Sequence, residues 1–192
     1  LKGKTKLLAK KNLYNEIDFS PNGQFVLISI IQNPFSYLVP YYRFPMKYVI
    51  LSSKGKELTV LHEVPLIEDL PKGFMAVRTG PRNFSWRADK PSNLIFVEAL
   101  DGGNPEVDSK YRDEVFEIGY PFKQNKVSLL KTINRFYRLD WCNDTLALGY
   151  DYWWNTRNTK TYMFNPSNKN KEAEIIIDRN YQDRYNDPGS FV

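Results

Sequence analysis

Residues 84–100 read FSWRADKPSNLIFVEAL, and the same pattern recurs as IDFSPNGQFVLISII at 17–31 and as LDWCNDTLALGYDYW at 139–153. Each copy begins with an apolar residue, a spacer and an aromatic residue, continues through a short polar turn and ends in a strongly apolar run. Short runs rich in Val, Ile and aromatic residues favour β-strands. Three copies of a strand–turn–strand unit therefore predict an internally repeated, all-β fold.

Two further strands are predicted behind each copy. The third strand is expected at 46–53, 112–119 and 159–166, and the fourth at 58–64, 126–133 and 173–178. A polar, Lys-rich turn separates these two strands each time, with the sequences SKGKE, PFKQNK and SNKNKE. Repeated four-stranded antiparallel meanders are typical of β-propeller blades. We predict a β-propeller section of about three such blades, with a β-sandwich as the alternative.

The repeat also predicts where the blades begin and end. The three blades are expected at 16–65, 83–134 and 137–179, after the outer strand of a preceding blade at 1–15 and before the run-in to a following blade at 180–192. Because propellers typically have about four to eight blades, three do not close a ring. This and the first residue, Leu1, predict an internal or processed section of a larger protein. The open sheet edges of such a section make edge-to-edge self-association an expected behaviour.

Composition and motifs exclude several classes of function. With one cysteine and one histidine the chain has neither a disulfide framework nor a structural metal site, so no cofactor or metal is predicted. No GxSxG, HExxH, P-loop or CxxC motif is present, and no apolar run reaches the ~20 residues of a membrane helix. Cys142 is expected to be a small buried hydrophobe and His62 a structural or surface residue. The compartment stays open, with a periplasmic or secreted location expected for a bacterial protein.

The longest connections are predicted to emerge at one end of the blades. They run over 32–45 and 100–113 between second and third strands, and over 65–83 between two blades, where 68–78 is expected to hold one short helical turn. Long ordered loops on a rigid scaffold are where binding residues concentrate. Nine of the ten arginines lie in or beside connections at this end: Arg43, Arg78, Arg82, Arg112, Arg135, Arg138, Arg157, Arg179 and Arg184.

The positive charge is divided between the two ends of the predicted blades. The turns at the other end carry Lys54, Lys56, Lys123, Lys126, Lys169 and Lys171. Because a phosphate track needs lysine and arginine along one groove, nucleic-acid binding is disfavoured despite the net charge of +5. Arginine offers a flat bidentate fork to carboxylates, so the loop end is predicted to bind acidic groups. The alternative for each arginine is an ion pair with an acid of this chain: Glu68, Asp69, Asp113, Asp151 or Asp183.

Two adjacent tryptophans stand out in the segment DYWWNTRNTKTYMFNP at 151–166. If Trp153 and Trp154 end a strand, they point to opposite faces of the sheet and at least one is expected to pack inside. Asn155, Arg157 and the outward indole are then the exposed groups of the following turn. A stand-alone propeller that binds a glycan or protein ligand through these tryptophans is the alternative function.

Four segments carry a resemblance that covers nearly the whole chain in order. They are PFSYLVPYYRFPMK at 34–47, SWRADKPSNLIFVEALDGG at 85–103, DWCNDTLALGYDYWWNTRNTKTYMFNP at 140–166 and DRNYQDRYNDPGSF at 178–191. They resemble the propeller domain of glutamyl endopeptidases in the prolyl oligopeptidase superfamily. The WRADKP and NDPGS runs are the most specific parts of this resemblance.

The resemblance implies a parent enzyme that cleaves peptides after acidic residues, mainly glutamate. In that family a propeller caps a C-terminal α/β-hydrolase domain with a Ser, Asp and His triad, so no catalytic residue is expected in this chain. The expected partners are that hydrolase domain and peptide substrates, without nucleic acid or membrane. The residues predicted to bind substrate or to hold the domain interface are Arg43, Arg157, Arg78, Arg82, Asn155 and Trp154.

Overall fold

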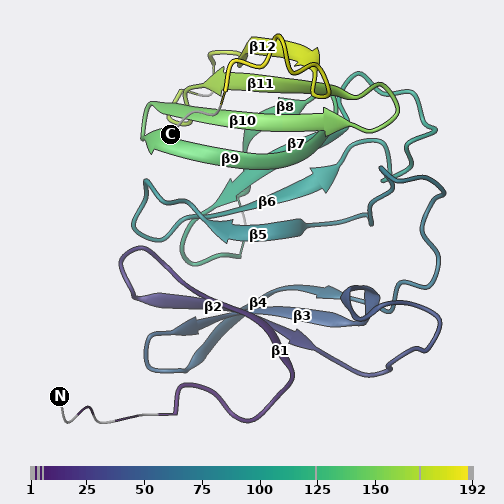
Figure 1. The fold of residues 1–192 in the computed structure, drawn as a ribbon. Helices are drawn as coiled ribbons and strands as arrows, with labels where there is room; N and C mark the ends of the chain where they lie inside the picture. Colours follow the sequence, from purple (N-terminus) through teal and green to yellow (C-terminus); the bar gives the residue numbers. More distant parts are fainter. Residues whose placement is uncertain (1–2, 4, 6, 124, 169, 190–192) are drawn as a thin grey trace. The chain divides into compact units, whose positions relative to one another are not determined.

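The structure is a computed structural model that describes residues 3, 5, 7–123, 125–168 and 170–189. Among these residues twelve strands form three four-stranded sheets, and in each sheet the spatial order of the strands follows the chain (Figure 1). All three sheets are antiparallel. The prediction of an all-β fold with three four-stranded antiparallel meanders is therefore confirmed.

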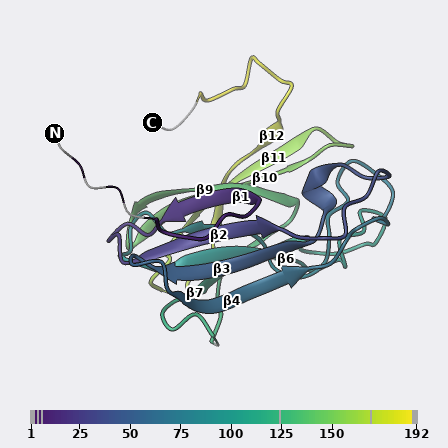
Figure 2. The same cartoon turned by 90° about the horizontal axis from the view of Figure 1, so that it is seen from below.

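The first sheet contains β1 (Tyr14–Phe19), β2 (Phe25–Ile31), β3 (Met46–Ser52) and β4 (Glu57–Val64). The second contains β5 (Arg82–Trp86), β6 (Leu94–Ala99), β7 (Asp113–Ile118) and β8 (Val127–Thr132). The third contains β9 (Arg135–Asn143), β10 (Leu146–Trp153), β11 (Asn158–Phe164) and β12 (Glu174–Asn180). The four strands of the first sheet lie side by side in Figure 2.

The chain folds as two compact units. The first unit comprises 1–69, 84–95 and 118–125, and the second comprises 70–83, 96–117 and 126–192. The strands of the second sheet contribute to both units. No described helix is long and apolar enough to cross a bilayer.

The middle strands of each sheet carry the core, as their apolar runs predict. In β2, Val26 and Ile28 are buried, and they form a cluster with Val49 and Leu51 of β3. Both strands are nearly continuous hydrophobic runs, because neighbouring side chains on opposite faces of the sheet are buried alike. The outer strands β4 and β12 are largely exposed, which is typical of sheet edges.

The segment before β1 differs from its predicted strand. Its described residues, 3, 5 and 7–13, belong to no strand, and residues 1, 2, 4 and 6 lie outside the described part. Leu8 and Ala9 instead pack against the β2–β3 cluster. A Cβ at Gly55 would lie 1.9 Å from the Leu8 carbonyl oxygen, so the segment approaches the β3–β4 turn closely. Its assignment to a preceding blade stays a prediction.

The loops carry two further differences from the sequence-based expectations. The segment 68–78 contains no helix but does hold one short turn, in which the Ala76 N–H donates to the Gly73 carbonyl at 3.1 Å; the described part of the chain has its one 3₁₀ turn at Tyr41–Arg43, directly after Pro40. Within 68–78, Gly73 adopts φ +110°, a value that does not fit a helix. Lys169 and 190–192 lie outside the described residues, so the predicted run-in at 180–192 is seen only to 189.

The expectation that Cys142 is buried is wrong, because its side chain is exposed. Cys142 is the penultimate residue of β9, which is an edge strand of its sheet. The strand runs directly into a polar turn, in which the Thr145 N–H donates to Asn143 Oδ1 at 2.9 Å. The apolar character of cysteine did not reveal that the last two residues of β9 are exposed.

Candidate functional site

A buried ion-pair network occupies the second unit at the start of β5, β7 and β9. Asp113 Oδ2 lies 2.6 Å from Arg82 Nη2, and Asp113 Oδ1 lies 3.1 Å from Arg135 Nη1. Asp101 Oδ2 accepts from Arg135 Nη2 at 2.7 Å and from Arg112 Nη1 at 2.9 Å. The two carboxylates are thus each shared between two guanidinium groups.

The network fastens two long loops to the strand ends. Arg135 Nε donates to the Met75 carbonyl at 2.8 Å, and Arg112 Nη1 donates to the Val107 carbonyl at 2.6 Å. Burial alone would raise the pKa of Asp101, but the hydrogen bonds from Arg135 and Arg112 hold that pKa below its ordinary value. These arginines therefore hold the loops 70–81 and 100–112 in place.

Two of the predicted site residues are committed to this loop architecture. Arg82 is only 7% exposed and pairs with Asp113, so the ion-pair alternative holds for this residue. Arg78 turns back on its own loop, where Nη1 donates to the Thr79 carbonyl at 3.1 Å and Nη2 donates to the Pro81 carbonyl. Both side chains brace the connection between β4 and β5.

Arg43 lies in the first unit, at the end of the 3₁₀ turn between β2 and β3. Its carbonyl accepts from the Ile67 N–H at 2.9 Å, and its Nε is buried without a hydrogen-bond partner among the described atoms. Tyr41 and Tyr42, its neighbours in the sequence, are exposed.

Trp154, Asn155 and Arg157 are brought together in the turn that joins β10 to β11. Trp153 and Asn158 form the last pair of the two strands, which leaves a four-residue turn at 154–157. Arg157 ends this turn with φ +56°, in the left-handed region that favours glycine and asparagine. Asn155 is exposed at the tip.

The guanidinium group of Arg157 is fixed against Trp154. It lies 3.9 Å from the centroid of the Trp154 ring, and Nη1 donates to the Trp154 carbonyl at 2.7 Å. A second contact joins Nη1 to the Tyr181 hydroxyl at 3.4 Å. No ion pair between Arg157 and a carboxylate is found in the described part of the chain.

The two tryptophans have different surroundings. Trp153 is half-buried, with the Arg112 guanidinium 4.4 Å from its ring centroid, whereas Trp154 is 41% exposed. Phe74 packs on Trp154 with ring centroids 5.4 Å apart. Trp154 is therefore the outward indole of the pair.

An open, largely apolar depression of about 350 Å³ lies beside this turn, and we call it the Trp154 pocket. Its lining is largely aromatic and comes from β9, β10, β11, the β10–β11 turn and the residue after β12: Tyr137, Asp151, Tyr152, Trp154, Thr159 and Tyr181. Tyr152 pairs with Thr159 across β10 and β11, and its ring meets that of Tyr137 edge to face at 5.8 Å. Tyr137 and Tyr181 were not anticipated from the sequence, since no motif connects residues so far apart.

Asp151 lies beneath the pocket and is almost completely buried, with 1% exposure. Its carboxylate accepts from the N–H and side-chain amide of Asn134, the Tyr162 hydroxyl and the Lys160 N–H, at 2.9, 3.0, 2.6 and 3.0 Å. Burial raises the pKa of Asp151 above its ordinary value, although these four donors oppose the rise. The pKa of the Tyr162 phenol is raised as well, by burial and by the charge of Asp151.

The raised pKa of Asp151 predicts a pH-dependent difference between the wild type and an Asp151→Asn variant. As the pH rises above the unfolded-state value of about 3.9, the unfolded chain releases this proton first. The free energy of unfolding of the wild type should then fall relative to the variant, until the pH passes the raised pKa of the folded state. Urea titrations of both proteins across this range measure the difference, and a pH-independent difference would contradict the prediction.

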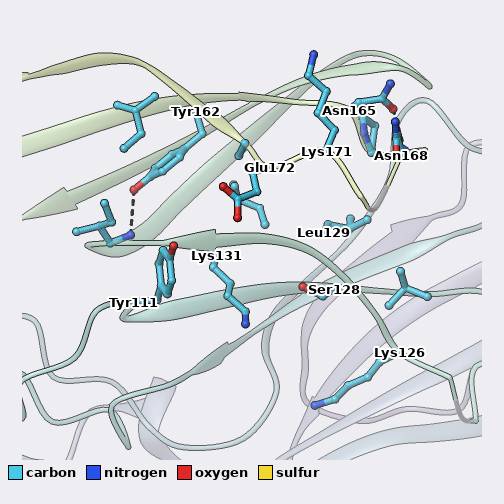
Figure 3. Close-up of a pocket in the computed structure, with 16 residues that line it drawn as sticks. Tyr111, Lys126, Ser128, Leu129, Lys131, Tyr162, Asn165, Asn168, Lys171 and Glu172 are labelled. Atoms are coloured by element: carbon cyan, nitrogen blue, oxygen red, sulfur yellow. Dashed lines mark hydrogen bonds between the residues drawn. The ribbon is translucent and has the colours of Figure 1, made fainter.

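A second cavity, of about 580 Å³, lies in the second unit between β8 and the turn that joins β11 to β12. Figure 3 shows Lys126, Lys131, Lys171 and Glu172 around it, and a dashed line at the Tyr162 hydroxyl, which accepts from the Ile133 N–H at 2.9 Å. Lys126 pairs with Glu98 at 2.5 Å and Lys131 lies 3.9 Å from Glu114. With two of its lysines already beside acids, this cavity is a weaker candidate than the Trp154 pocket.

Fold and site together define an all-β module with arginine-braced loops and an aromatic pocket. No protein-family model matches the chain. Probable chloroplastic glutamyl endopeptidases of Oryza sativa subsp. japonica and Arabidopsis thaliana are 37% and 35% identical to it over 98% and 99% of its length. The chain spans about a fifth (20%) of each of these relatives and is related to that part of them.

One solved structure is similar at a much lower level of sequence identity. It is an uncharacterized protein of Listeria monocytogenes EGD-e, with 13% identity and a TM-score of 0.48. The match covers 88% of this chain and 41% of the other.

Proposed function

We propose that the chain is the non-catalytic β-propeller portion of a serine peptidase of the prolyl oligopeptidase superfamily that resembles glutamyl endopeptidase. It caps the hydrolase domain of the parent protein, limits access to the catalytic site and orients peptides with acidic side chains. The observation that carries this proposal is the match of nearly the whole chain to a fifth of two proteins named as probable glutamyl endopeptidases.

The three meanders support the propeller part of the proposal. Each is a four-stranded antiparallel sheet in chain order, which is the construction of a propeller blade. The proposed blades at 16–65, 83–134 and 137–179 coincide with the three sheets, which span 14–64, 82–132 and 135–180, to within two residues at each end. Within the second unit, a Cβ at Gly149 of β10 would lie 2.3 Å from Leu130 Cδ2 of β8, so the second and third sheets pack closely there.

The contacts of the candidate arginines order them by their suitability for an acidic substrate. Arg82 and Arg78 are committed to the loop between β4 and β5, whereas Arg157 is oriented by Trp154 and keeps Nε and Nη2 without a carboxylate among the described residues. A guanidinium held in place loses little freedom when it forms a bidentate pair. Arg157 is therefore the first candidate and Arg43 the second, with a role at the hydrolase interface as the alternative for both.

Kinetics of the full-length protein with paired Glu and Gln peptides test this proposal. Arg157→Gly removes the guanidinium and places the residue best suited to φ +56° in the turn, so the fold should be kept. Loss of a charge-assisted hydrogen bond of about 1.5–3 kcal/mol should lower the Glu-over-Gln ratio of kcat/KM at least about tenfold. Arg43→Ala is expected to act in the same direction.

Arg184→Ala is the matched control, because Arg184 is an exposed arginine of the same unit and its loss changes the net charge equally. It should leave the ratio within about twofold. If both candidate variants kept the wild-type ratio while the melting temperature fell, Arg43 and Arg157 would belong to the domain interface. A full-length protein without activity on any Glu peptide would exclude the peptidase proposal itself.

A further inference from the structure

We propose that the Trp154 pocket binds an apolar side chain of a peptide whose adjacent acidic residue pairs with Arg157. The inference rests on the proposed function, because it assumes that the parent protein cleaves peptides next to acidic residues. It adds a second requirement to substrate choice, which is an aromatic or branched aliphatic residue next to the acidic one.

The dimensions of the pocket fit a single side chain. Its volume of about 350 Å³ lies at the lower end of the range for ligand sites. Four of its six lining residues are aromatic, namely Tyr137, Tyr152, Trp154 and Tyr181. Tyr137 is 63% exposed, and Trp154 is 41% exposed with Phe74 and Arg157 already against its ring, so part of each ring is open to a ligand. Such rings offer a large apolar area to a flat or branched group.

The charge beside the pocket selects an acidic neighbour. Arg157 contacts two of the lining residues, Trp154 through the ring and the carbonyl, and Tyr181 through the hydroxyl. Two acids, Asp178 on β12 and Asp187 after it, are already engaged, the first with Lys160 at 2.5 Å and the second with Arg179 at 3.0 Å. Arg157 is thus a preorganised cation without a carboxylate among the described residues, next to an apolar cavity.

Two polar residues of the pocket, Thr159 and Asp151, have little hydrogen-bonding capacity left for a sugar. The Thr159 hydroxyl donates to the Asp151 carbonyl at 2.6 Å, and the Asp151 carboxylate already accepts four hydrogen bonds. A sugar ring buries several hydroxyl groups that each need a partner. A neutral sugar would also leave the charge of the Arg157 guanidinium without a counter-charge.

The test uses the full-length protein and Glu peptides in which each residue flanking the glutamate is Phe, Leu, Ser or Gly. We expect kcat/KM to favour Phe or Leu over Gly at one flanking position by at least about tenfold. Trp154→Ala should reduce this preference to about twofold and should change the Glu-over-Gln ratio less than Arg157→Gly does. Arg157→Gly should lower the Glu-over-Gln ratio more than Trp154→Ala does and should change the preference for Phe or Leu less.

Two further variants make the result independent of folding defects. Tyr137→Ser removes an exposed wall of the pocket and should weaken the same preference, while Tyr185→Ala removes an exposed tyrosine outside the pocket and should leave it unchanged. An apolar preference that survives both Trp154→Ala and Tyr137→Ser would overturn the inference. Competition by an oligosaccharide that is lost in Trp154→Ala would overturn it as well.

Direct binding separates this inference from the proposed function. If the full-length protein cleaves no Glu peptide, the proposed function fails. Calorimetry with a short Phe-Glu peptide then still tests the pocket. Binding that weakens at least about tenfold in both Trp154→Ala and Arg157→Gly supports the site, and equal binding by wild type and variants overturns it.

Discussion

Replacement of Asp113 by alanine is expected to lower the free energy of unfolding by about 3–5 kcal/mol. The Asp113 side chain is fully buried and accepts from Arg82 at 2.6 Å, from Arg135 at 3.1 Å and from the Phe136 N–H at 2.8 Å. Its removal leaves two nearly buried guanidinium groups with only Asp101 for compensation. Uncompensated buried charge is the most costly consequence of breaking such a pair.

Urea denaturation of the wild type and of two variants checks this result. Asp140→Ala is the control, because Asp140 pairs with Arg138 at 3.2 Å but both side chains are well exposed. Exposed pairs contribute about 0–1 kcal/mol, so this variant should be close to the wild type. Equal costs for the two substitutions would show that the network at Asp113 does not hold the loops.

This network explains why clustered arginines were an ambiguous signal. The sequence placed nine arginines in or beside the connections at one end of the predicted blades, but it did not show which carboxylates lie within reach. Asp101 and Asp113 lie in different loops and strands from Arg82 and Arg135, so their pairing depends on tertiary structure. Arg157 differs from them because its partners, Trp154 and Tyr181, are aromatic.

The strands were predictable because their signals are local. Each apolar run of β2, β6 and β10 is preceded by a polar turn, such as the one at 20–24, in which Gly23 adopts φ +67°. Turn residues and short β-branched or aromatic runs set both the strand ends and the antiparallel order. The described part of 1–13 departs from this rule, because it packs on the face of the first sheet through Leu8 and Ala9.

Only part of the candidate site was predictable, because only its local sequence signals can be recognised. Trp154, Asn155 and Arg157 are close in sequence and lie in one turn, so the pattern WWNTR identified them. Tyr137 on β9 and Tyr181 after β12 line the pocket only because the third sheet brings both residues beside that turn. A pocket wall built from distant strands has no local sequence motif of its own.

Substitution of Gly103 by alanine should have the second-largest effect on stability. Gly103 adopts φ +76°, and a Cβ there would lie 2.0 Å from the Val77 carbonyl oxygen, a backbone atom that cannot rotate away. The Val77 N–H also donates to the Gly103 carbonyl at 3.1 Å, so the two loops meet backbone to backbone. Alanine must separate them and disturb the Met75 carbonyl that accepts from Arg135.

Gly102→Ala is the matched control for this effect. Gly102 adopts φ +65°, but a Cβ there would meet no described atom within 4 Å, so alanine costs only the left-handed backbone term of about 1–2 kcal/mol. Gly103→Ala bears the same term and an additional overpacking cost of about 1–3 kcal/mol. Denaturant titrations of both variants isolate the close approach by subtraction. If the two alanines cost the same, loops 70–81 and 100–112 are not held together at this point, and the ion-pair network alone fixes them.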